Sequence, residues 1–218
     1  MLLIFDWDGT LSDSAARIIH CVQQAALSTG HKPLPDDDIR NIIGLGLSEA
    51  MQRLYPELDE DSKECVKQSY VEHFLALDQT PSSFFDGVLD GLAQLRQEGF
   101  QLAVATGKSR KGLNRVLNNL GMEHFFDDSR CADETASKPH PLMLEELLSA
   151  FNRQPHQAVM VGDTEYDMEM AQVAGVPRVA VSYGAPHIDR LHPYQPVLAV
   201  DHFSEFVDWV IATYKPAA

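Results

Sequence analysis

Short apolar runs that alternate with helical segments constrain the fold of this 218-residue sequence more than any other feature. The first run, Leu2–Phe5, is continuously apolar and stops at Asp6, where an acidic loop that contains Gly9 begins. Runs of this length and composition are typical of strands that are buried on both faces of a parallel sheet. We therefore expect Leu2–Phe5 to be a central strand.

The alternation of apolar runs and helical segments resumes at Gly87 and continues from there. Several of the predicted helices are followed by a glycine stop, at Gly99, Gly121 and Gly175. The predicted helices are residues 89–97, 112–120, 142–151 and 168–174, and the predicted strands are residues 102–105, 129–132, 158–161, 179–182 and 197–200. Strands that alternate with helices at this spacing indicate an α/β fold with a parallel sheet and helices on both of its faces.

The stretch between the first strand and Gly87 follows a different pattern. Ser12, Asp13 and Ser14 are predicted to cap a helix, and helical, polar and acidic sequence continues to about residue 80 without an evident strand. We therefore expect a catalytic core, formed by residues 1–14 and 81–218, and an inserted helical cap, formed by residues 15–80. The segment 44–46, Gly-Leu-Gly, is predicted to be a helix-ending turn or a cap loop that faces the substrate.

Charge and cysteine content exclude several classes of partner. The formal net charge of −15 opposes binding to nucleic acid or to an anionic membrane surface, because both depend on clustered Lys and Arg. The three cysteines have no paired spacing, and the apolar run at the N-terminus is too short for a signal peptide or a membrane span. We expect a cytoplasmic protein whose partner is a small molecule, and an anionic substrate would need positive charge supplied within the site.

The polar residues that follow the predicted strands are the candidate functional residues. Ligands of open α/β sheets bind at the carboxyl ends of the strands, near the point where the strand order reverses. The residues at these positions are Asp6 and Asp8 after the first strand, Thr106, Gly107 and Lys108 after the second, Lys138 in a later loop, and Asp163 and Asp167 after the strand 158–161. We expect them to meet at one edge of the sheet.

The two aspartates after the first strand suit covalent chemistry at phosphorus. The Asp6 carboxylate is a candidate nucleophile, provided that its charge is screened from the incoming phosphate. Asp8 lies two residues further along and is a candidate general acid and base, which would protonate the leaving oxygen and later deprotonate water. Magnesium prefers hard oxygen ligands, so Asp6, the backbone carbonyl of Asp8 and Asp163 are the predicted metal ligands.

The remaining candidates suit binding of the transferred phosphoryl group. The Thr106 hydroxyl, the Gly107 backbone N–H and the Lys138 ammonium can stabilise the charge that its equatorial oxygens carry in the transition state. Together with Mg²⁺, these groups would supply the local positive charge that an anionic substrate requires.

These motifs resemble the four ordered motifs of the haloacid dehalogenase (HAD) superfamily, essentially from end to end of the chain. The residues that carry the resemblance are Asp6-Trp7-Asp8-Gly9-Thr10-Leu11, Thr106-Gly107-Lys108, Lys138-Pro139 and Gly162-Asp163-Thr164-Glu165-Tyr166-Asp167. The resemblance implies a Rossmann-like core with a helical cap and an aspartyl-phosphate mechanism, and it is greatest for the phosphoglycolate phosphatase-like group. It also implies that Asp167 supports the lysine and the waters of the metal.

Simpler interpretations exist for single residues of these motifs. Asp8 precedes a glycine, and Asp-Gly is a common turn dipeptide. Lys138 can be read as a solvated loop residue, and Asp167 as a carboxylate that the helix dipole favours in a first turn. The presence of all four motifs in order favours the chemical interpretation of each residue.

Three other functions share parts of this pattern. A phosphorylation-dependent receiver also carries an acceptor aspartate, but after a mid-chain strand, and a carbon-attacking dehalogenase lacks the second aspartate and the metal. A phosphomutase would use the same residues and stays an alternative to a phosphatase. Phosphoglycolate, sugar phosphates and nucleotides all remain open as substrates. We expect the cap residues Leu45, Leu47 and Arg53 to influence the choice, with Arg53 as a partner for a substrate carboxylate or as a solvated residue.

Overall fold

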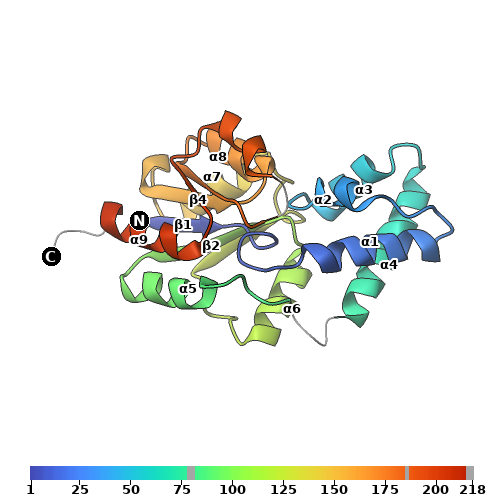
Figure 1. Cartoon of the computed structure of the whole chain (residues 1–218), viewed down its shortest axis with the longest axis horizontal. Helices are drawn as coiled ribbons and strands as arrows, with labels where there is room; N and C mark the ends of the chain where they lie inside the picture. Colours follow the sequence, from blue (N-terminus) through green and yellow to red (C-terminus); the bar gives the residue numbers. More distant parts are fainter. Residues whose placement is uncertain (78–81, 185–186, 215–218) are drawn as a thin grey trace.

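The computed structural model describes residues 1–77, 82–184 and 187–214, and it is built on a six-stranded parallel sheet of order β3-β2-β1-β4-β5-β6 (Figure 1). The strands are β1 (Leu2–Phe5), β2 (Gln101–Thr106), β3 (Asp128–Cys131), β4 (Ala158–Gly162), β5 (Arg178–Val181) and β6 (Leu198–Val200). Strand β1 is central, as predicted, and every one of its residues is buried because helices cover both faces of the sheet. The predicted α/β fold is confirmed.

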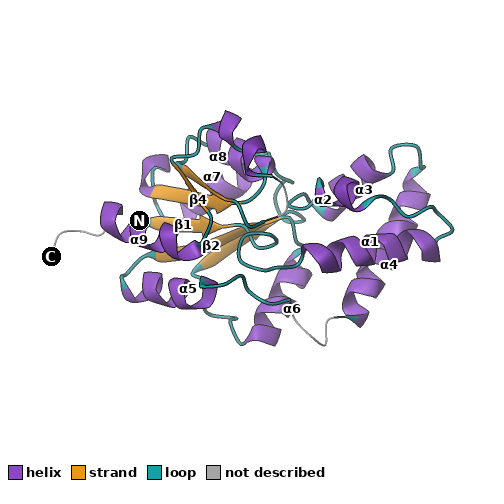
Figure 2. Cartoon of the chain, in the orientation of Figure 1, coloured by secondary structure: helices purple, strands orange, loops and turns teal. Residues whose placement is uncertain are grey.

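The helices of the core form two layers, one on each face of the sheet (Figure 2). One face packs on α5 (Val88–Gln97), α6 (Arg110–Leu120) and α9 (Phe203–Tyr214), and the other packs on α7 (Leu142–Ala150) and α8 (Glu165–Val173). Alternate β1 residues pack against opposite helix layers. Leu3 and Phe5 belong to the apolar cluster of the first face, and Leu2 and Ile4 belong to that of the second. None of the described helices is long and apolar enough to cross a lipid bilayer.

Two helix starts lie earlier than predicted because side chains cap them. Thr164 accepts a hydrogen bond from the backbone N–H of Asp167, so α8 begins at Glu165 rather than at residue 168. Ser109 accepts one from the N–H of Gly112, so α6 begins at Arg110 rather than at residue 112. Both positions follow the ends of strands, and early capping keeps the loops between strand and helix short.

Four helices between β1 and α5 form a separate lobe beyond the carboxyl ends of the strands, on the side away from both termini (Figure 1). They are α1 (Ala15–Ser28), α2 (Asp36–Arg40), α3 (Leu47–Leu54) and α4 (Glu60–Ala76), and the described part of this segment contains no named strand. The lobe has an apolar cluster of its own, centred on residues such as Val22, Met51 and Val66. The predicted boundary with the core at residues 80 and 81 lies outside the described residues.

The chain leaves the core and returns to it along two adjacent segments. The backbone N–H of Asp13 donates to the carbonyl of Ser83 at 2.9 Å, and that of Phe85 donates to Leu11 at 3.1 Å. The two segments that connect the lobe to the core, around residues 11–13 and 83–85, are therefore hydrogen-bonded to each other.

Candidate active site

The candidate residues gather where the direction of strand order reverses, at the carboxyl end of β1. Strand β2 lies on one side of β1, and β4 lies on the other. At such a point of an α/β sheet, the loops that follow the two neighbouring strands diverge and leave room for a ligand. Asp6 follows β1 and donates its backbone N–H to Val161 of β4 at 3.0 Å. Thr106 is the last residue of β2, and Asp163 follows the last residue of β4.

Three buried carboxylates form a compact acidic cluster at this point. Asp6, Asp163 and Asp167 each present an oxygen, and these oxygens lie within 4.8 Å of one another. The Nζ atom of Lys138 lies 2.6 Å from Asp6 Oδ1 and 2.6 Å from Asp167 Oδ1. The lysine is only 1% exposed, so its two ion pairs are shielded from water.

Hydroxyl groups hold two of these carboxylates in place. Both the hydroxyl and the backbone N–H of Thr164 donate to Asp167 Oδ2, at 2.6 and 3.1 Å, while Oδ1 of the same carboxylate contacts Lys138. The hydroxyl of Thr10 donates to Asp163 Oδ1 at 2.9 Å. Asp167 thus has partners on both oxygens, which suits a residue that orients Lys138.

The shared burial of acids and lysine shifts their pKa values. Burial raises the pKa of Asp6 well above its ordinary value; Lys138 acts against this shift, and Asp167 and Asp163 add to it. Burial alone would lower the pKa of Lys138, but attraction by Asp167 and Asp6 outweighs it, and the pKa lies above its ordinary value. The lysine is therefore a permanent cation in this site.

The cluster fits a divalent cation by charge and by ligand type. When all three carboxylates are ionised, one lysine leaves two negative charges buried without compensation, and burial of unpaired charge is costly. Oδ2 of Asp6 has no hydrogen-bond partner within the described part of the chain. Hard carboxylate oxygens are the ligands that Mg²⁺ prefers. A cation here would also favour the ionised form of Asp6.

Glycines allow the backbone to approach Asp163 from two sides. A Cβ atom at Gly9 or at Gly184 would come within 2.2 Å of the Asp163 side chain, and Gly9 also has a positive φ of 87°. Any side chain at either position would collide with the carboxylate. Gly184 follows β5 and was not singled out in the sequence, because no motif surrounds it.

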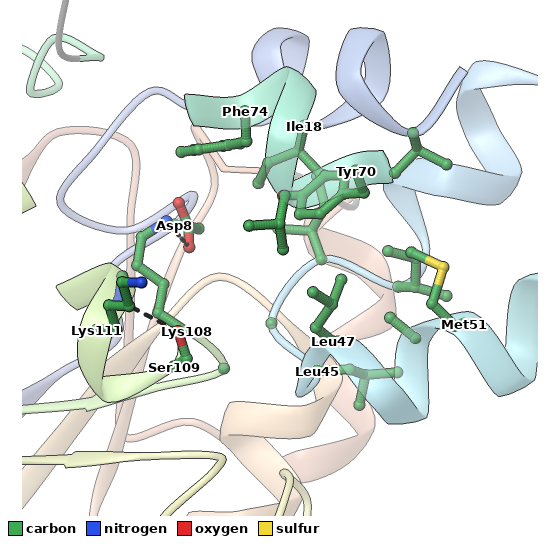
Figure 3. Close-up of a pocket in the computed structure, with 18 of the residues that line it drawn as sticks. Asp8, Ile18, Leu45, Leu47, Met51, Tyr70, Phe74, Lys108, Ser109 and Lys111 are labelled. Atoms are coloured by element: carbon green, nitrogen blue, oxygen red, sulfur yellow. Dashed lines mark hydrogen bonds and ion pairs between the residues drawn. The ribbon is translucent and has the colours of Figure 1, made fainter. Parts of the chain in front are cut away.

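Asp8 lies at the edge of the cluster and faces the cap. The hydroxyl of Ser14 donates to Asp8 Oδ1 at 2.6 Å. Lys108 Nζ lies 3.0 Å from Asp8 Oδ2, and Figure 3 shows this pair. The prediction that Ser14 caps the first cap helix with its side chain is wrong: it is the N-cap residue of α1 but makes no side-chain cap hydrogen bond, because its hydroxyl is bonded to Asp8.

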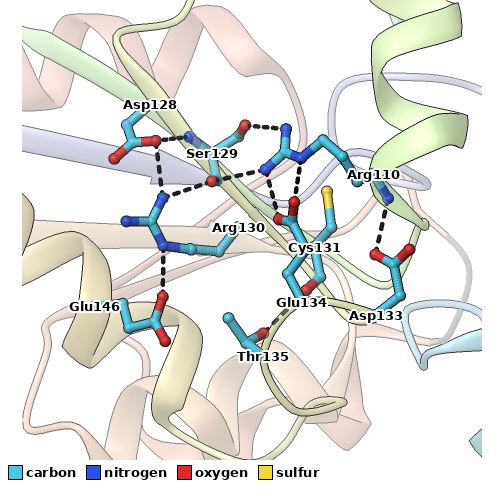
Figure 4. A network of polar contacts seen from close by, with 9 residues as sticks. All are labelled: Arg110, Asp128, Ser129, Arg130, Cys131, Asp133, Glu134, Thr135 and Glu146. Carbon is cyan, nitrogen blue, oxygen red and sulfur yellow. Dashed lines mark hydrogen bonds and ion pairs between the residues drawn. The ribbon is translucent and has the colours of Figure 1, made fainter.

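A polar network braces the loop that leads from β3 toward Lys138 (Figure 4). Arg110, near the start of α6, forms an ion pair with Glu134 at 2.8 Å, and its backbone N–H donates to Asp133 at 2.8 Å. Its guanidinium also donates to the side chain and the carbonyl of Ser129 in β3. The start of α6, which follows the Thr106 loop, is thereby joined to the segment that precedes Lys138.

The cap contacts three loops of the core through the segment 44–46. The N–H of Gly46 donates to Ser137 Oγ at 2.8 Å, next to Lys138. A Cβ atom at Gly44 would lie 3.2 Å from Thr164 Oγ1, and one at Gly107 would lie 2.4 Å from the carbonyl oxygen of Leu45. The segment predicted to be a turn or a substrate-facing loop thus lies directly over the loops that follow β2, β3 and β4.

We predict that Gly107→Ala lowers kcat/KM about 10²-fold for every substrate. The new methyl group would meet the backbone oxygens of Leu45 and Gly44 at 2.4 and 2.6 Å, so the cap has to move away from the core. Displacement of a positioning element by ~1 Å costs about this factor. Steady-state kinetics on two unrelated esters tests the prediction, with thermal unfolding as the control for folding. An unchanged kcat/KM would show that the close approach of cap and core does not matter for turnover.

Arg53 binds the core rather than a cavity. Its Nη1 donates to the Tyr166 hydroxyl at 3.0 Å, its Nε donates to Glu49 at 3.3 Å, and its guanidinium lies 5.1 Å from the Tyr166 ring centroid. Tyr166 in turn donates to the carbonyl of Asn41 at 2.8 Å. Arg53 is not among the residues that line the cavity between cap and core. The structure thus gives Arg53 a contact between cap and core, which favours a positioning role over the expected pairing with a substrate carboxylate.

The structure brings Asp6, Asp163, Asp167 and Lys138 together, pairs Asp8 with Lys108, and adds partners that the motifs alone did not reveal. Thr10 and Thr164 lie within the quoted motifs, so their positions were available as a signal. Ser14 and Lys108 bind Asp8 from outside the first motif, and nothing local in the sequence relates them to it.

The first strand of this parallel α/β sheet is followed by a buried aspartate that is paired with a lysine and grouped with two further acids, which gives a carboxylate-centred site. The sequence model described as haloacid dehalogenase-like hydrolase matches residues 3–181. The chain belongs to this family. The resemblance carried by the four motifs is thus confirmed, and with it the expectation of an enzyme.

Individual relatives agree with this assignment. A probable phosphatase, IndB, of Dickeya dadantii is 36% identical over 98% of this chain and 95% of its own length. A phosphoglycolate phosphatase of Psychrobacter arcticus is 29% identical over 98% of this chain and 96% of its own. The solved structure of a predicted phosphoglycolate phosphatase from Haemophilus somnus has a TM-score of 0.87 at 25% identity and covers 96% of this chain and 97% of its own.

Proposed function

We propose that this chain is a magnesium-dependent phosphatase that hydrolyses a small phosphorylated metabolite through an aspartyl phosphate on Asp6. The observation that carries the proposal is the position of Lys138, whose Nζ lies 2.6 Å from both Asp6 and Asp167 inside a buried acidic cluster. The similarity to relatives that are named phosphatases supports the same activity.

In the first half of the reaction, Asp6 attacks phosphorus while the bond from phosphorus to the leaving oxygen breaks. Asp8 gives that oxygen its proton, so the product alcohol leaves neutral. Thr106, the N–H of Gly107 and Lys138 hold the equatorial oxygens of the phosphoryl group. The hydroxyl of Ser14 and the ammonium of Lys108 fix the orientation of the Asp8 carboxylate for this transfer.

In the second half, Asp8 takes a proton from a water molecule, whose oxygen attacks the phosphorus bound to Asp6. The bond between Asp6 and phosphorus breaks, inorganic phosphate leaves, and Asp6 regains its carboxylate. A second aspartate in this position is the feature that favours hydrolysis over the long-lived phosphoaspartate of a receiver.

Asp6, Asp163 and the backbone carbonyl of Asp8 are the proposed ligands of magnesium. When bound, Mg²⁺ neutralises charge on the phosphate and on Asp6 and so permits two anions to approach. Asp167 is assigned to Lys138 instead, because Thr164 and the lysine engage both of its oxygens. The division into a core (residues 1–14 and 81–218) and a cap (residues 15–80) belongs to the same proposal. The hydrogen bonds between the two connecting segments, at Asp13 and Ser83 and at Leu11 and Phe85, support it.

We predict that Mg²⁺ is required for release of phosphate. Removal of divalent metal with a chelator is expected to abolish activity, and Mg²⁺ to restore it, whereas Ca²⁺ inhibits because its larger and looser coordination shell misplaces Asp6. The measurement is inorganic phosphate released from a panel of phosphomonoesters. Full activity in chelator would refute the metal site, and isomerisation of a sugar phosphate without phosphate release would identify a phosphomutase instead.

A further inference from the structure

A cavity of about 180 Å³ lies between the cap and the start of α6, and it borders the candidate site at Asp8 and Gly107. Figure 3 shows its two unlike walls: Asp8, Lys108, Ser109 and Lys111 on the core side, and apolar side chains on the cap side. The cap wall includes Ile18, Leu45, Leu47, Met51, Tyr70 and Phe74. Three cap helices and the 42–45 loop therefore converge on one space next to the proposed general acid.

No residue that lines the cap side carries a charge, within the part of the chain that the structure describes. Burial raises the pKa of Tyr70, and Asp8 adds to the shift, so its phenol stays neutral. Arg53, which lies on the helix that bears Leu47 and Met51, is bound to Tyr166 and Glu49 instead. A carboxylate placed against the cap wall would therefore be desolvated without a cationic partner there.

The charged groups of the cavity lie on the core wall, close to where the phosphoryl group would sit. Lys108, Lys111 and Arg115 line it, and Asp8 is the single acid among the lining residues. Lys108 contacts Asp8 at 3.0 Å and lies 5.2 Å from the centroid of the Phe74 ring. The cavity thus offers cations at one wall and an apolar surface at the other, which matches a molecule with an anionic head and an apolar body.

We infer that the substrate is a phosphomonoester whose organic part is apolar, of about the size of one ring or a short alkyl chain, and that the cap wall selects it over carboxylated and polyhydroxylated esters. This inference rests on the proposed phosphatase activity and adds the substrate class to it. An apolar protein cavity of ~150 Å³ accommodates a benzene molecule, so a cavity of about 180 Å³ takes one ring with little space to spare.

The physical basis of this selection is the cost of burying polar groups without partners. A carboxylate would lose water at the cap wall without a cationic partner there, and the several hydroxyls of a sugar would meet the phenol of Tyr70 as the one polar side chain among the described residues that line this wall. An apolar group gains from the same burial. Each methylene that is buried contributes about fourfold to binding until the cavity is filled. Because the contacts are made throughout the reaction, the gain is expressed in kcat/KM.

The experiment measures kcat/KM with Mg²⁺ for methyl, propyl and benzyl phosphate, and for phosphoglycolate and ribose 5-phosphate. All five carry the phosphate on an sp³ carbon, which limits differences caused by the leaving group. We expect a rise of about fourfold per added methylene along the series and a value for benzyl phosphate about tenfold or more above that for phosphoglycolate. A flat or falling series, or a higher value for phosphoglycolate or ribose 5-phosphate, would overturn the inference.

A positive charge introduced on the cap wall is expected to shift the substrate preference toward carboxylated esters. Leu47→Arg puts a guanidinium at the first residue of α3, on the cavity wall, where it can pair with a carboxylate. The ratio of kcat/KM between benzyl phosphate and phosphoglycolate is expected to fall about 100-fold. The matched control is Leu27→Arg: this leucine is 55% exposed on α1 of the same cap and does not line the cavity. It should leave the ratio unchanged.

The outcomes separate the inference from the function on which it rests. Equal ratios in Leu47→Arg and Leu27→Arg would show that the cap wall does not touch the substrate and would overturn the inference. If Leu47→Arg does not fold, as judged by thermal unfolding, the wild-type series decides by itself. Phosphate release in the reversed order refutes the apolar substrate alone. No phosphate release from the five esters or from the wider panel of phosphomonoesters refutes both proposals.

Discussion

Asp6→Asn is expected to reduce kcat by about 10⁴-fold or more, because an amide oxygen is a far weaker nucleophile toward phosphorus than a carboxylate. The substitution keeps the shape of a side chain that is fully buried at the end of β1, so the fold should survive. It also removes one of three clustered negative charges, which partly compensates for the lost attraction to Lys138. The measurement is phosphate release at saturating ester and Mg²⁺, with circular dichroism as the check on folding.

Asp13→Asn is the matched control for this experiment. Asp13 is exposed in the segment that leads into the cap, and the same chemical change there should leave activity at the wild-type level. If Asp6→Asn retained more than a trace of magnesium-dependent phosphate release, the nucleophile would have to be another group and the aspartyl-phosphate mechanism would be wrong.

The sheet was predictable because its signal is local. Strands β1, β2 and β4 are buried on both faces, so each is a continuous apolar run that can be recognised without knowledge of its neighbours. The polar residues that end these runs meet at one edge of the sheet because parallel strands all point the same way. The position of the functional edge follows from that one rule.

Helix α9 is missing from the predicted elements, although its apolar residues have a helical spacing that the sequence shows. Its buried residues Phe203, Phe206, Val207 and Val210 have helical spacing, and they pack against the layer that includes α5. Strand β3 is the opposite case: the strand predicted at residues 129–132 is found at Asp128–Cys131, although its own sequence is polar and it lies at the edge of the sheet. The regular alternation of strands and helices indicated it, and its composition alone did not.

Side-chain partners across the cap and core could not be predicted, because they depend on how the two parts meet. The Ser14 hydroxyl has a capping position by sequence, yet Asp8 is the acceptor it reaches in the folded chain. Arg53 is on a helix surface by sequence, yet the stacking ring and hydroxyl of Tyr166, 113 positions away, hold it. Ser14 thus has a partner six positions away in place of a helix N–H, and Arg53 has a distant partner in addition to Glu49. Only the tertiary structure supplies these contacts.

Lys138→Met is expected to lower kcat by about 10²- to 10³-fold or more for all esters alike, because it removes the cation that we propose binds the phosphoryl group common to them. It should also destabilise the protein by about 3–5 kcal/mol without Mg²⁺, since the side chain occupies similar space but leaves Asp6 and Asp167 buried without their ammonium. Added Mg²⁺ should recover part of this loss, because it binds the folded acidic cluster. Kinetics and urea unfolding with and without Mg²⁺ test both parts.

The control is Lys63→Met, which removes a lysine whose ion pair with Glu60, at 3.0 Å, lies on the cap helix α4. A helical pair of this kind contributes ~0.5 kcal/mol or less, so this variant should resemble the wild type in stability and in its response to Mg²⁺. An equal stability loss in both variants would mean that the two pairs of Lys138 contribute no more than the helical pair of Lys63 and Glu60. Normal turnover in Lys138→Met would remove the lysine from the phosphoryl-binding site, because no other described group contacts both Asp6 and Asp167 in its place.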